Sequence, residues 1–216
     1  TFLIKDNIAI KGEPLTCSSN ILKSYKSPFN ATVIEKIQKE GGIITGQTNC
    51  DEFAMGSSSE FSIYGSVKNP FNSDLVAGGS SGGSAAAIAE NLADISLGSD
   101  TGGSVRQPSA FCGIYGLKPT YGRISRYGLV AHASSFDTIG IMSKDLTDVY
   151  KTFSVISGID KKDATSCNIP LNDKFSLKAS KLPKSIGVVS KNILKDVNPC
   201  LLYTSPSPRD GLLSRM

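Results

Sequence analysis

The sequence predicts an α/β fold in which short apolar strands alternate with helices. Three observations support this prediction: apolar runs of strand length, helix-forming segments between them, and glycine-rich turns where one element ends and the next begins. No segment is repeated along the chain. With 216 residues, 39% of them hydrophobic, the chain is long enough to bury one sizeable core, so a single domain is expected.

The first part of the chain is expected to supply a strand, a helix and a second strand. Residues 2–4 are all apolar and predict a buried strand. A helix capped by Asn30 or Thr32 should follow, with its apolar residues on one face, and should stop at the glycine pair 41–42. The apolar residues 43–44 then begin a short strand, which completes an αβ unit.

The middle of the chain repeats this alternation around two glycine-rich loops. The loop at 78–84 leads into the alanine-rich segment 85–93, which is a good helix former. Residues 95–97 are expected to form another short strand that runs into the loop at Asp100. Both loops therefore lie at the ends of predicted elements.

One more helix and one more strand are predicted beyond residue 140. Ser143 or Asp145 should cap a helix that continues to Ile156 and is closed by the glycine at 158. The lysine-rich segment 161–184 contains two prolines and is predicted to be a loop. The segment SIGVVS at 185–190 is typical of a strand.

Neither end of the sequence looks like a natural terminus. Thr1 opens directly into a predicted strand, so further residues are expected upstream. At Cys200 the composition changes to a segment rich in Ser, Pro and Arg without any helical or strand period. We therefore predict a partial domain over 1–199 that lacks its N- and C-terminal parts, and a non-native or disordered tail over 200–216.

Composition excludes several classes of protein and of site. The net charge of +4 indicates a nucleic-acid surface only weakly. The five cysteines are odd in number, widely spaced and free of any CxxC pair, which argues against a disulfide framework and against zinc, so no metal site and a reducing compartment are expected. No apolar run approaches the roughly 18 residues of a membrane span, so we expect a soluble, cytoplasmic protein. An organellar matrix is the alternative, because an upstream presequence is not visible.

Two serines in glycine-dense loops and one lysine suggest catalysis. Ser80 lies in GGSSGGS, Ser104 lies in GSDTGGSVRQPSAFCG, and Lys5 follows the first apolar run. Residues 78–104 contain seven glycines, and such a stretch lets backbone N–H groups approach a neighbour closely. An anion or an oxyanion is the expected guest.

Other chemistries have less support. GGSSG matches the G-x-S-x-G elbow, and Ser80, Asp100 and His132 fall in the chain order of α/β-hydrolase triads. However, the residues before Ser80 are polar rather than an apolar strand, and His132 is the single histidine. Neither phosphate-loop motif, G-x-x-x-x-G-K-[ST] or G-x-G-x-x-G, is present.

A lysine base fits the sequence better than a histidine. Lysine accepts a proton only when neutral, and lowering its pKa from about 10.4 to near 7 requires desolvation or positive neighbours worth roughly 4 to 5 kcal/mol. The apolar residues before Lys5 offer such surroundings. The alternative is a strand-end charge that pairs with Asp6.

The segments LIKDNI, GGSSGGS and DTGGSVRQPSAFCGIYGLKPTYGR together resemble the amidase signature family. The resemblance covers residues 1 to about 199 and implies the amidase signature fold, a mixed central sheet covered by helices that is incomplete in this chain. It also implies a catalytic triad of Lys5, Ser80 and Ser104. In that triad Ser104 is the acyl nucleophile, Ser80 relays its proton to Lys5, and the peptide bond between Gly79 and Ser80 is cis.

The resemblance assigns supporting roles as well. The backbone amides of Thr101, Gly102 and Gly103 are implied to form the oxyanion hole, which would stabilise charge on the attacked carbonyl oxygen. Three residues are implied to form the loop beside the acyl site: Met55, Gly56 and Ser57. A plain turn is the alternative for that loop. Asp100 and Arg106 carry opposite charges on either side of the nucleophile loop and are expected to pair and brace it.

Within the family, segments 48–71 and 122–140 are most similar to the glutamine-hydrolysing components of tRNA-dependent amidotransferases. This likeness implies hydrolysis of glutamine through an acyl-enzyme and transfer of ammonia to partner subunits B and C. Those subunits would use ATP and Mg to convert Glu-tRNA(Gln) to Gln-tRNA(Gln), or Asp-tRNA(Asn) to Asn-tRNA(Asn), whereas no cofactor is expected in this chain. Residues that recognise glutamine lie, in the family, beyond the portion present. A stand-alone amidase of broad specificity and a non-catalytic anion-binding module are the alternatives.

Overall fold

A computed structural model describes residues 1–170, which belong to one compact unit. The strand predicted at 185–190, the domain end at 199 and the tail 200–216 lie outside the described residues. The elements in chain order are β1 (Phe2–Lys5), the 3₁₀ turn η1 (Asn20–Leu22), α1 (Thr32–Lys39), β2 (Ile44–Thr48), the 3₁₀ turn η2 (Glu52–Ala54), β3 (Lys68–Asn69), β4 (Asn72–Val76), α2 (Gly82–Ala89), β5 (Ile95–Asp100), α3 (Arg106–Phe111), β6 (Tyr115–Leu117), β7 (Thr138–Ser143) and α4 (Leu146–Ile156).

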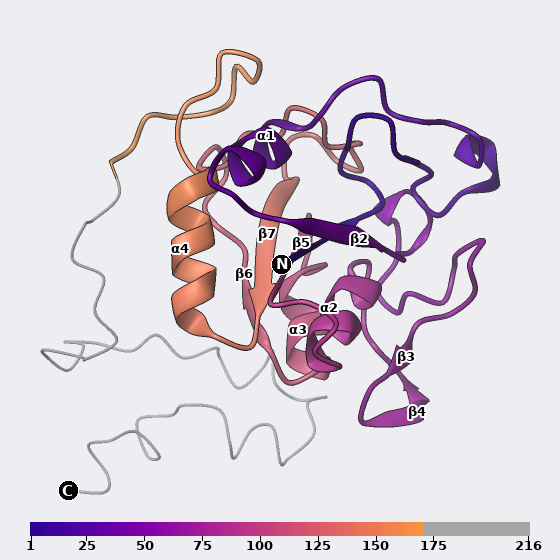
Figure 1. Ribbon diagram of the computed structural model, residues 1–216. Helices are drawn as coiled ribbons and strands as arrows, with labels where there is room; N and C mark the ends of the chain where they lie inside the picture. The colour runs from indigo at the N-terminus through magenta and orange to yellow at the C-terminus, as the bar shows by residue number, and fades with distance from the viewer. Residues whose placement is uncertain (171–216) are drawn as a thin grey trace, which may run out of the picture. The chain divides into compact units, whose positions relative to one another are not determined.

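A five-stranded sheet in the order β2-β1-β5-β7-β6 forms the centre of this unit (Figure 1). β1 runs parallel to both β2 and β5, whereas β7 is antiparallel to β5 and to β6. The sheet is therefore mixed, and the predicted α/β fold with a mixed central sheet is confirmed. β3 and β4 form a separate antiparallel pair.

Helices and apolar side chains cover both faces of the sheet. On one face, α1 and α4 contribute to a large apolar cluster with residues of β1, β5 and β7, among them Ile139 and Ile141. On the other face, α2 and the residues that flank α3, Val105 and Cys112, pack with Met142 in a smaller cluster. Successive side chains of a strand point to opposite faces, which explains how β7, fully buried, serves both clusters. The result is a helix–sheet–helix sandwich.

The predicted cap of α1 is wrong. The N-cap is Ala31, which has no side chain able to accept a hydrogen bond. Both expected capping residues have other partners: Asn30 Oδ1 accepts from the Lys11 amide at 2.7 Å, and the Thr32 hydroxyl donates to Asp160 at 2.6 Å. Long-range hydrogen bonds therefore replaced the local capping bond that the sequence pattern favours.

The other two predicted helices, α2 and α4, lie close to their predicted positions. Asp145 caps α4 by accepting from the Thr147 amide at 2.6 Å, and Gly158 follows this helix with a φ of +104°. α2 occupies the first part of the alanine-rich segment, beginning at Gly82. As predicted, residues 161–170 contain no helix or strand.

Several elements were not predicted: β3, β4, β6, β7 and α3. β3 and β4 lie in the polar segment 68–76, which has the turn-like composition that masks a short hairpin. α3 contains Pro108, and β7 contains Gly140, residues that weaken a helix or strand prediction. Tertiary packing therefore determines these elements more than their local sequence does.

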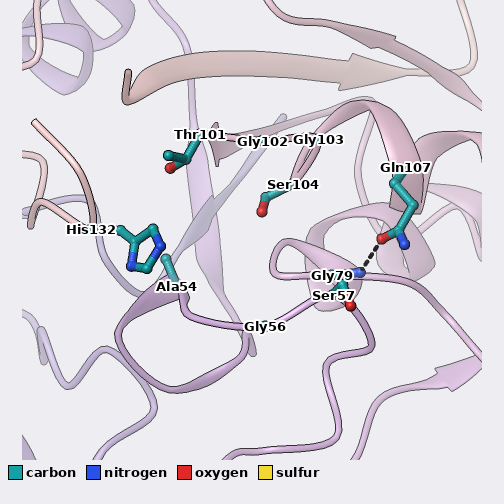
Figure 2. Close-up of a pocket in the computed structure, with 10 residues that line it drawn as sticks. All are labelled: Ala54, Gly56, Ser57, Gly79, Thr101, Gly102, Gly103, Ser104, Gln107 and His132. Atoms are coloured by element: carbon teal, nitrogen blue, oxygen red, sulfur yellow. Dashed lines mark hydrogen bonds between the residues drawn. The ribbon is translucent and has the colours of Figure 1, made fainter. Parts of the chain in front are cut away.

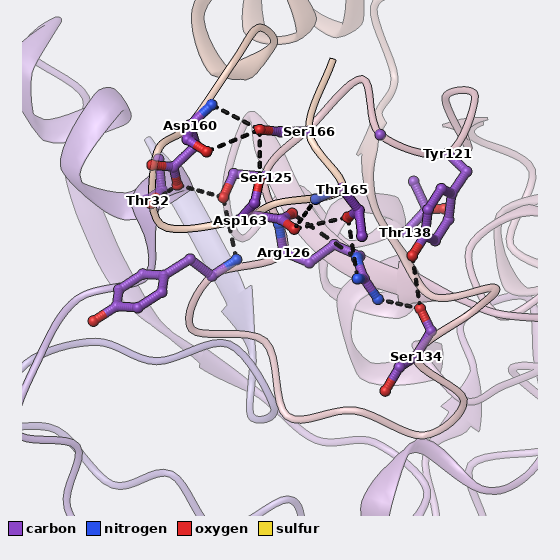
Figure 3. Close-up of polar contacts among 12 residues, drawn as sticks. Thr32, Tyr121, Ser125, Arg126, Ser134, Thr138, Asp160, Asp163, Thr165 and Ser166 are labelled. Carbon is purple, nitrogen blue, oxygen red and sulfur yellow. Dashed lines mark hydrogen bonds and ion pairs between the residues drawn. The ribbon is translucent and has the colours of Figure 1, made fainter.

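Two aspartates fasten the long segment between β6 and β7 (Figure 3). Asp160 Oδ2 accepts from the hydroxyls of Thr32 and Ser125, both at 2.6 Å, and so joins α1 to this segment. Asp163 Oδ2 accepts from the Arg126 amide at 2.8 Å.

Among residues 1–170, no helix is long and apolar enough to cross a membrane.

Candidate active site

Lys5 and Ser80 meet in the interior of the protein. Lys5 ends β1, Ser80 lies in the loop before α2, and both side chains are fully buried. Lys5 Nζ lies 2.7 Å from Ser80 Oγ, which is hydrogen-bonding distance. The Gly79–Ser80 peptide bond is cis, as the family resemblance implies. The two predicted residues are thus in direct contact although they are 75 positions apart in the chain.

The surroundings of Lys5 weaken its hold on a proton. Burial lowers the pKa of Lys5 from 10.5 to about 8, although Cys50 and Asp51 act in the opposite direction. The alternative pairing with Asp6 is not present. The Asp6 carboxylate instead accepts hydrogen bonds from the Thr16 amide and hydroxyl and from the Ser18 amide.

Two further polar residues, not singled out in the sequence, surround the same amine. Lys5 Nζ also lies 2.9 Å from Ser99 Oγ, and Asn7 Nδ2 donates to that oxygen at 3.0 Å. Ser99 lies on β5, is 4% exposed, and immediately precedes Asp100. Both residues lie inside or directly beside segments that carry the family resemblance, but neither has a role in the implied triad. The pairing of β1 with β5 is what brings them together, and only the sheet order reveals it.

Ser104 lies on the wall of a cavity of about 390 Å³ (Figure 2). The residues around it come from the end of η2, from the first turn of α3 and from the loops after η2, β4, β5 and β6. The lining residues are Ala54, Gly56, Ser57, Gly79, Thr101, Gly102, Gly103, Ser104, Gln107 and His132. Lys5 and Ser80 do not line it. The structure therefore places the predicted nucleophile on the cavity wall and the predicted base in the interior, joined through the Gly79–Ser80 segment.

The described residues contain no hydrogen bond between the hydroxyls of Ser80 and Ser104. What joins the two loops is a backbone bond, from the Ser81 amide to the Ser104 carbonyl, at 3.2 Å. The structure therefore contains one of the two contacts of the predicted proton relay, the contact between Lys5 and Ser80. The step between the serines stays a prediction.

Asp100 organises the nucleophile loop. Its carboxylate, fully buried, accepts from the Gly103 amide at 2.8 Å, from the Val105 amide at 3.0 Å and from Arg106 Nη2 at 2.9 Å. Burial by itself would raise the pKa of Asp100, but the hydrogen bonds from Arg106 and the backbone amides outweigh it and lower the pKa. The expected pair of Asp100 and Arg106 is present.

This arrangement engages one of the three amides that are predicted to form the oxyanion hole. The Gly103 amide is already bound to Asp100, so in this conformation it has no free N–H for a substrate oxygen. The amides of Thr101 and Gly102 donate to no other group in the described part of the chain, and both residues line the cavity. Two of the three predicted donors are therefore free in this conformation, and the oxyanion hole of Thr101, Gly102 and Gly103 stays a prediction.

A second buried carboxylate fastens the other side of the cavity. Asp137 accepts from the Thr101 hydroxyl and from the backbone amides of His132, at 2.9 Å, and Ala133. It is 2% exposed. Asp137 therefore connects the predicted oxyanion loop to the loop that carries His132.

Glycine at position 79 permits a close approach between protein groups. A Cβ there would overlap Asp51 Oδ2 and would lie 2.8 Å from the Ser59 nitrogen. The Gly79 amide donates to Gln107 Oε1 at 3.0 Å (Figure 2). The group that approaches Gly79 closely is therefore a carboxylate of the protein itself, and an anion or oxyanion bound by these loops stays a prediction. Gly102 does have open space beside it.

The loop implied to lie beside the acyl site is only partly on the cavity. Gly56 and Ser57 line it, but the Met55 side chain is 66% exposed and is not part of the lining. Their role in substrate binding stays a prediction.

His132 lies on the cavity wall, which the sequence did not indicate (Figure 2). The triad of Ser80, Asp100 and His132 is nevertheless not assembled. Ser80 contacts Lys5, and Asp100 binds the amides and guanidinium of 103–106. In residues 1–170, no group of three or more His, Cys, Asp or Glu side chains could hold a metal ion.

Known proteins share both this sequence and this fold. The amidase family model matches residues 1–201. The chain belongs to the amidase family. The A-subunit of a glutamyl-tRNA(Gln) amidotransferase from Chlorobaculum tepidum is 62% identical over 163 residues, 76% of this chain and 34% of the relative. The crystal structure of the corresponding A-subunit from Thermotoga maritima superimposes with a TM-score of 0.76 at 50% identity, over 78% of this chain and 37% of that one.

Other amidase-family enzymes have the same fold at lower identity. Kluyveromyces lactis allophanate hydrolase matches with a TM-score of 0.76 and 36% identity, over 78% of this chain and 28% of that chain. The identity is thus higher to the amidotransferase subunits. The chain spans between 33% and 44% of the length of the curated amidotransferase subunits that it resembles.

Proposed function

We propose that this chain carries the catalytic triad of a glutamine-hydrolysing amidase subunit in a tRNA-dependent amidotransferase. The observation that supports it most is the buried contact between Lys5 Nζ and Ser80 Oγ, at 2.7 Å, next to a cavity lined by Ser104. Identity of 50% to 62% to relatives named as A-subunits of glutamyl-tRNA(Gln) amidotransferase supports the choice of substrate.

In the proposed acylation step, the Ser104 hydroxyl attacks the carboxamide carbon of glutamine. Its proton passes to Ser80 while the Ser80 proton passes to neutral Lys5, so that Ser80 ends as a hydroxyl. The negative charge that develops on the carbonyl oxygen accepts hydrogen bonds from the free amides of Thr101 and Gly102, an effect typically worth about 3 kcal/mol per donor.

The intermediate then collapses with cleavage of the carbon–nitrogen bond. Lys5 returns its proton through Ser80 to the leaving nitrogen, which departs as ammonia, and a glutamyl ester remains on Ser104. A water molecule hydrolyses this ester in the reverse sequence of proton transfers and releases glutamate. The triad thereby returns to its starting state.

The ammonia is used elsewhere in the complex. Partner subunits, equivalent to B and C, bind ATP and Mg and activate the misacylated tRNA that receives the ammonia. Glu-tRNA(Gln) is the acceptor that the relatives' names favour, and Asp-tRNA(Asn) is the alternative. We place the complex in the cytoplasm, or in an organellar matrix.

A stand-alone amidase is the second candidate, because amidase-family hydrolases match this fold as well as the amidotransferase subunit does. The two functions differ in their dependence on partners. Ammonia release from glutamine that rises when partner subunits and charged tRNA are added supports the amidotransferase. Partner-independent turnover of simple aryl or aliphatic amides supports the amidase instead.

The nucleophile is tested with a fluorophosphonate probe on the full-length protein in its complex. We expect labelling at Ser104 that disappears in Ser104→Ala and is strongly slowed in Lys5→Ala. Ser73→Ala and Lys39→Ala, which change an exposed serine and an exposed lysine, serve as matched controls and should label normally. Undiminished labelling of both triad variants would exclude the proposed triad, whereas a wild-type complex that is not labelled at all would favour a binding module.

A further inference from the structure

Ser99 is the second hydrogen-bonding partner of the Lys5 amine. Its Oγ lies 2.9 Å from Nζ, compared with 2.7 Å for Ser80 Oγ. Ser80 and Lys5 are fully buried, and Ser99 is 4% exposed, so water does not substitute readily for either hydroxyl. The position of the amine is therefore defined by two serines, of which only Ser80 belongs to the family triad.

Ser99 is itself held in place from two sides. The Ser81 hydroxyl donates to the Ser99 carbonyl at 3.2 Å and accepts from the Ser99 amide at 3.4 Å. The side-chain amide of Asn7 donates to Ser99 Oγ at 3.0 Å, and Asn7 is 1% exposed. Ser99 is thus fastened to the residue after Ser80 and to a residue two positions after Lys5.

The donors and lone pairs around the Ser99 hydroxyl indicate its role. Ser99 Oγ has two lone pairs, and the NH2 group of Asn7, which can only donate, occupies one of them. The other accepts an N–H of Lys5. A neutral amine has two N–H bonds and one lone pair, so an N–H directed at Ser99 leaves the lone pair for the Ser80 hydroxyl. After proton transfer, the same Ser99 lone pair stabilises the buried ammonium.

We propose that Ser99, oriented by Asn7, is a positioning residue that directs the lone pair of Lys5 at Ser80 and stabilises the ammonium formed in the reaction. The proposal rests on the function proposed above, because it assumes that Lys5 accepts the proton. It assigns no direct contact between Ser99 and substrate, since Ser99 does not line the cavity.

The test is the pH dependence of glutamine hydrolysis by the full-length protein in its complex, comparing wild type with Ser99→Ala. Losing the acceptor destabilises the ammonium, so the acid limb of kcat/KM should move to lower pH by about half a unit or more. We expect kcat to fall about tenfold or more while KM changes less than about twofold. Ser99→Thr, which retains the hydroxyl, should restore the wild-type profile.

Ser96→Ala is the matched control. Ser96 is a fully buried serine of the same strand, β5, and its hydroxyl donates to the Ser84 carbonyl rather than contacting Lys5. This variant loses one buried hydroxyl and should keep the acid limb in place. Asn7→Asp provides a second, opposite test, because a carboxylate near Ser99 should stabilise the ammonium and move the acid limb to higher pH.

The outcomes separate this inference from the proposed function. The positioning role is overturned if the acid limb of kcat/KM stays at its wild-type pH in Ser99→Ala, or if it shifts equally in Ser96→Ala. In both cases, wild-type hydrolysis and labelling of Ser104 would still support the triad. If Ser99→Ala does not fold, the Asn7→Asp variant decides. An acid limb of kcat/KM in Asn7→Asp that is unchanged or lies at lower pH than in wild type would overturn the positioning role. Wild-type complex without hydrolysis or labelling would overturn both.

Discussion

At the scale of the residue, the most informative group is a buried lysine with few charged partners. Lys5 is fully buried and contacts two hydroxyls, and no carboxylate forms an ion pair with it in the described residues. An ammonium in such a place is costly, which is why burial lowers its pKa to about 8. This unfavourable burial of the charge makes the neutral amine accessible near neutral pH, which is the form that a proton acceptor needs.

This lysine should make the folded state more stable as pH rises. Its pKa is lower in the folded state than in the unfolded state, so the unfolded chain binds more protons between about pH 8 and 10.5 and the free energy of unfolding increases over that range. Lys5→Met should abolish this rise and increase stability at pH 7 by about 1 to 2 kcal/mol. Urea unfolding at pH 7 and pH 9 measures both effects.

The control for this experiment is Lys39→Met, at an exposed position of α1. Removing a solvated charge there should change neither the stability at pH 7 nor its pH dependence. A Lys5→Met variant less stable than wild type at pH 7 would contradict the interpretation, because it would mean that the amine stabilises the fold more than burial destabilises it.

At the scale of the element, the site lies where β1 and β5 end and two loops cross. β1 supplies Lys5, β5 supplies Ser99 and Asp100, and the loops supply Ser80 and Ser104. Asp100 connects these parts, because its carboxylate binds the backbone that follows the strand. The parallel pairing of β1 with β5 therefore sets the geometry of the predicted triad more directly than any loop does.

The close approach at Gly79 predicts a large effect of a small substitution. In Gly79→Ala the new Cβ would overlap Asp51 Oδ2, which is buried and also accepts from the Ser59 amide. Relief requires movement of both loops, so we expect a loss of about 1 to 3 kcal/mol in the free energy of unfolding. Denaturant unfolding of the two proteins measures this loss.

Gly102→Ala is a matched control in the neighbouring loop. No atom lies within 4 Å of its added Cβ, so stability should stay within about 0.5 kcal/mol of wild type. Equal destabilisation by both substitutions would show that flexibility of glycine, rather than the close contact with Asp51, makes position 79 sensitive.

At the scale of the whole molecule, buried and half-buried carboxylates join segments that are distant in sequence. Asp100, Asp137, Asp160 and Asp163 each accept several hydrogen bonds, and Asp160 connects α1 with the segment between β6 and β7 (Figure 3). The two apolar clusters hold the helices on the sheet. The carboxylates add polar contacts to the long loops, including the segment between β6 and β7, which also contributes Ile124 to the larger cluster.

Acid should therefore unfold the protein through these carboxylates. Burial alone would raise the pKa values of Asp100, Asp160 and Asp163, but hydrogen bonds outweigh it and lower all three. A folded-state pKa below the unfolded value gives stability that is complete above about pH 5 and is lost as pH falls below about 4. Urea unfolding between pH 3 and pH 7 should show this loss of stability in wild type. In Asp160→Asn the free energy of unfolding should fall less over the same pH range.

Asp148→Asn is the control, because Asp148 lies on α4 and its side chain has, among the residues that the structure describes, only a surface ion pair with Lys151 at 3.9 Å. Its acid sensitivity should match that of wild type. If Asp160→Asn lost stability with acid as steeply as wild type does, the Asp160 network would not contribute to the acid transition.

The sequence by itself determined the fold class and the residues of the candidate triad, because both leave local or motif-scale signals. Apolar runs mark β1 and β5, alanine-rich and periodic segments mark the helices, and the glycine-serine motifs mark the loops that carry Ser80 and Ser104. Where one residue has a single dominant local role, as Asp145 does at its helix cap, the local prediction was also right.

Only the tertiary structure decided which groups surround those residues. It replaced the expected caps of α1 with long-range bonds, engaged the Gly103 amide with Asp100, placed His132 on the cavity wall and brought Ser99 and Asn7 to Lys5. The physical reason is that a hydrogen bond depends on position in space, and strand order sets that position between residues 92 to 94 places apart in the chain. No local pattern in the sequence encodes such a distance.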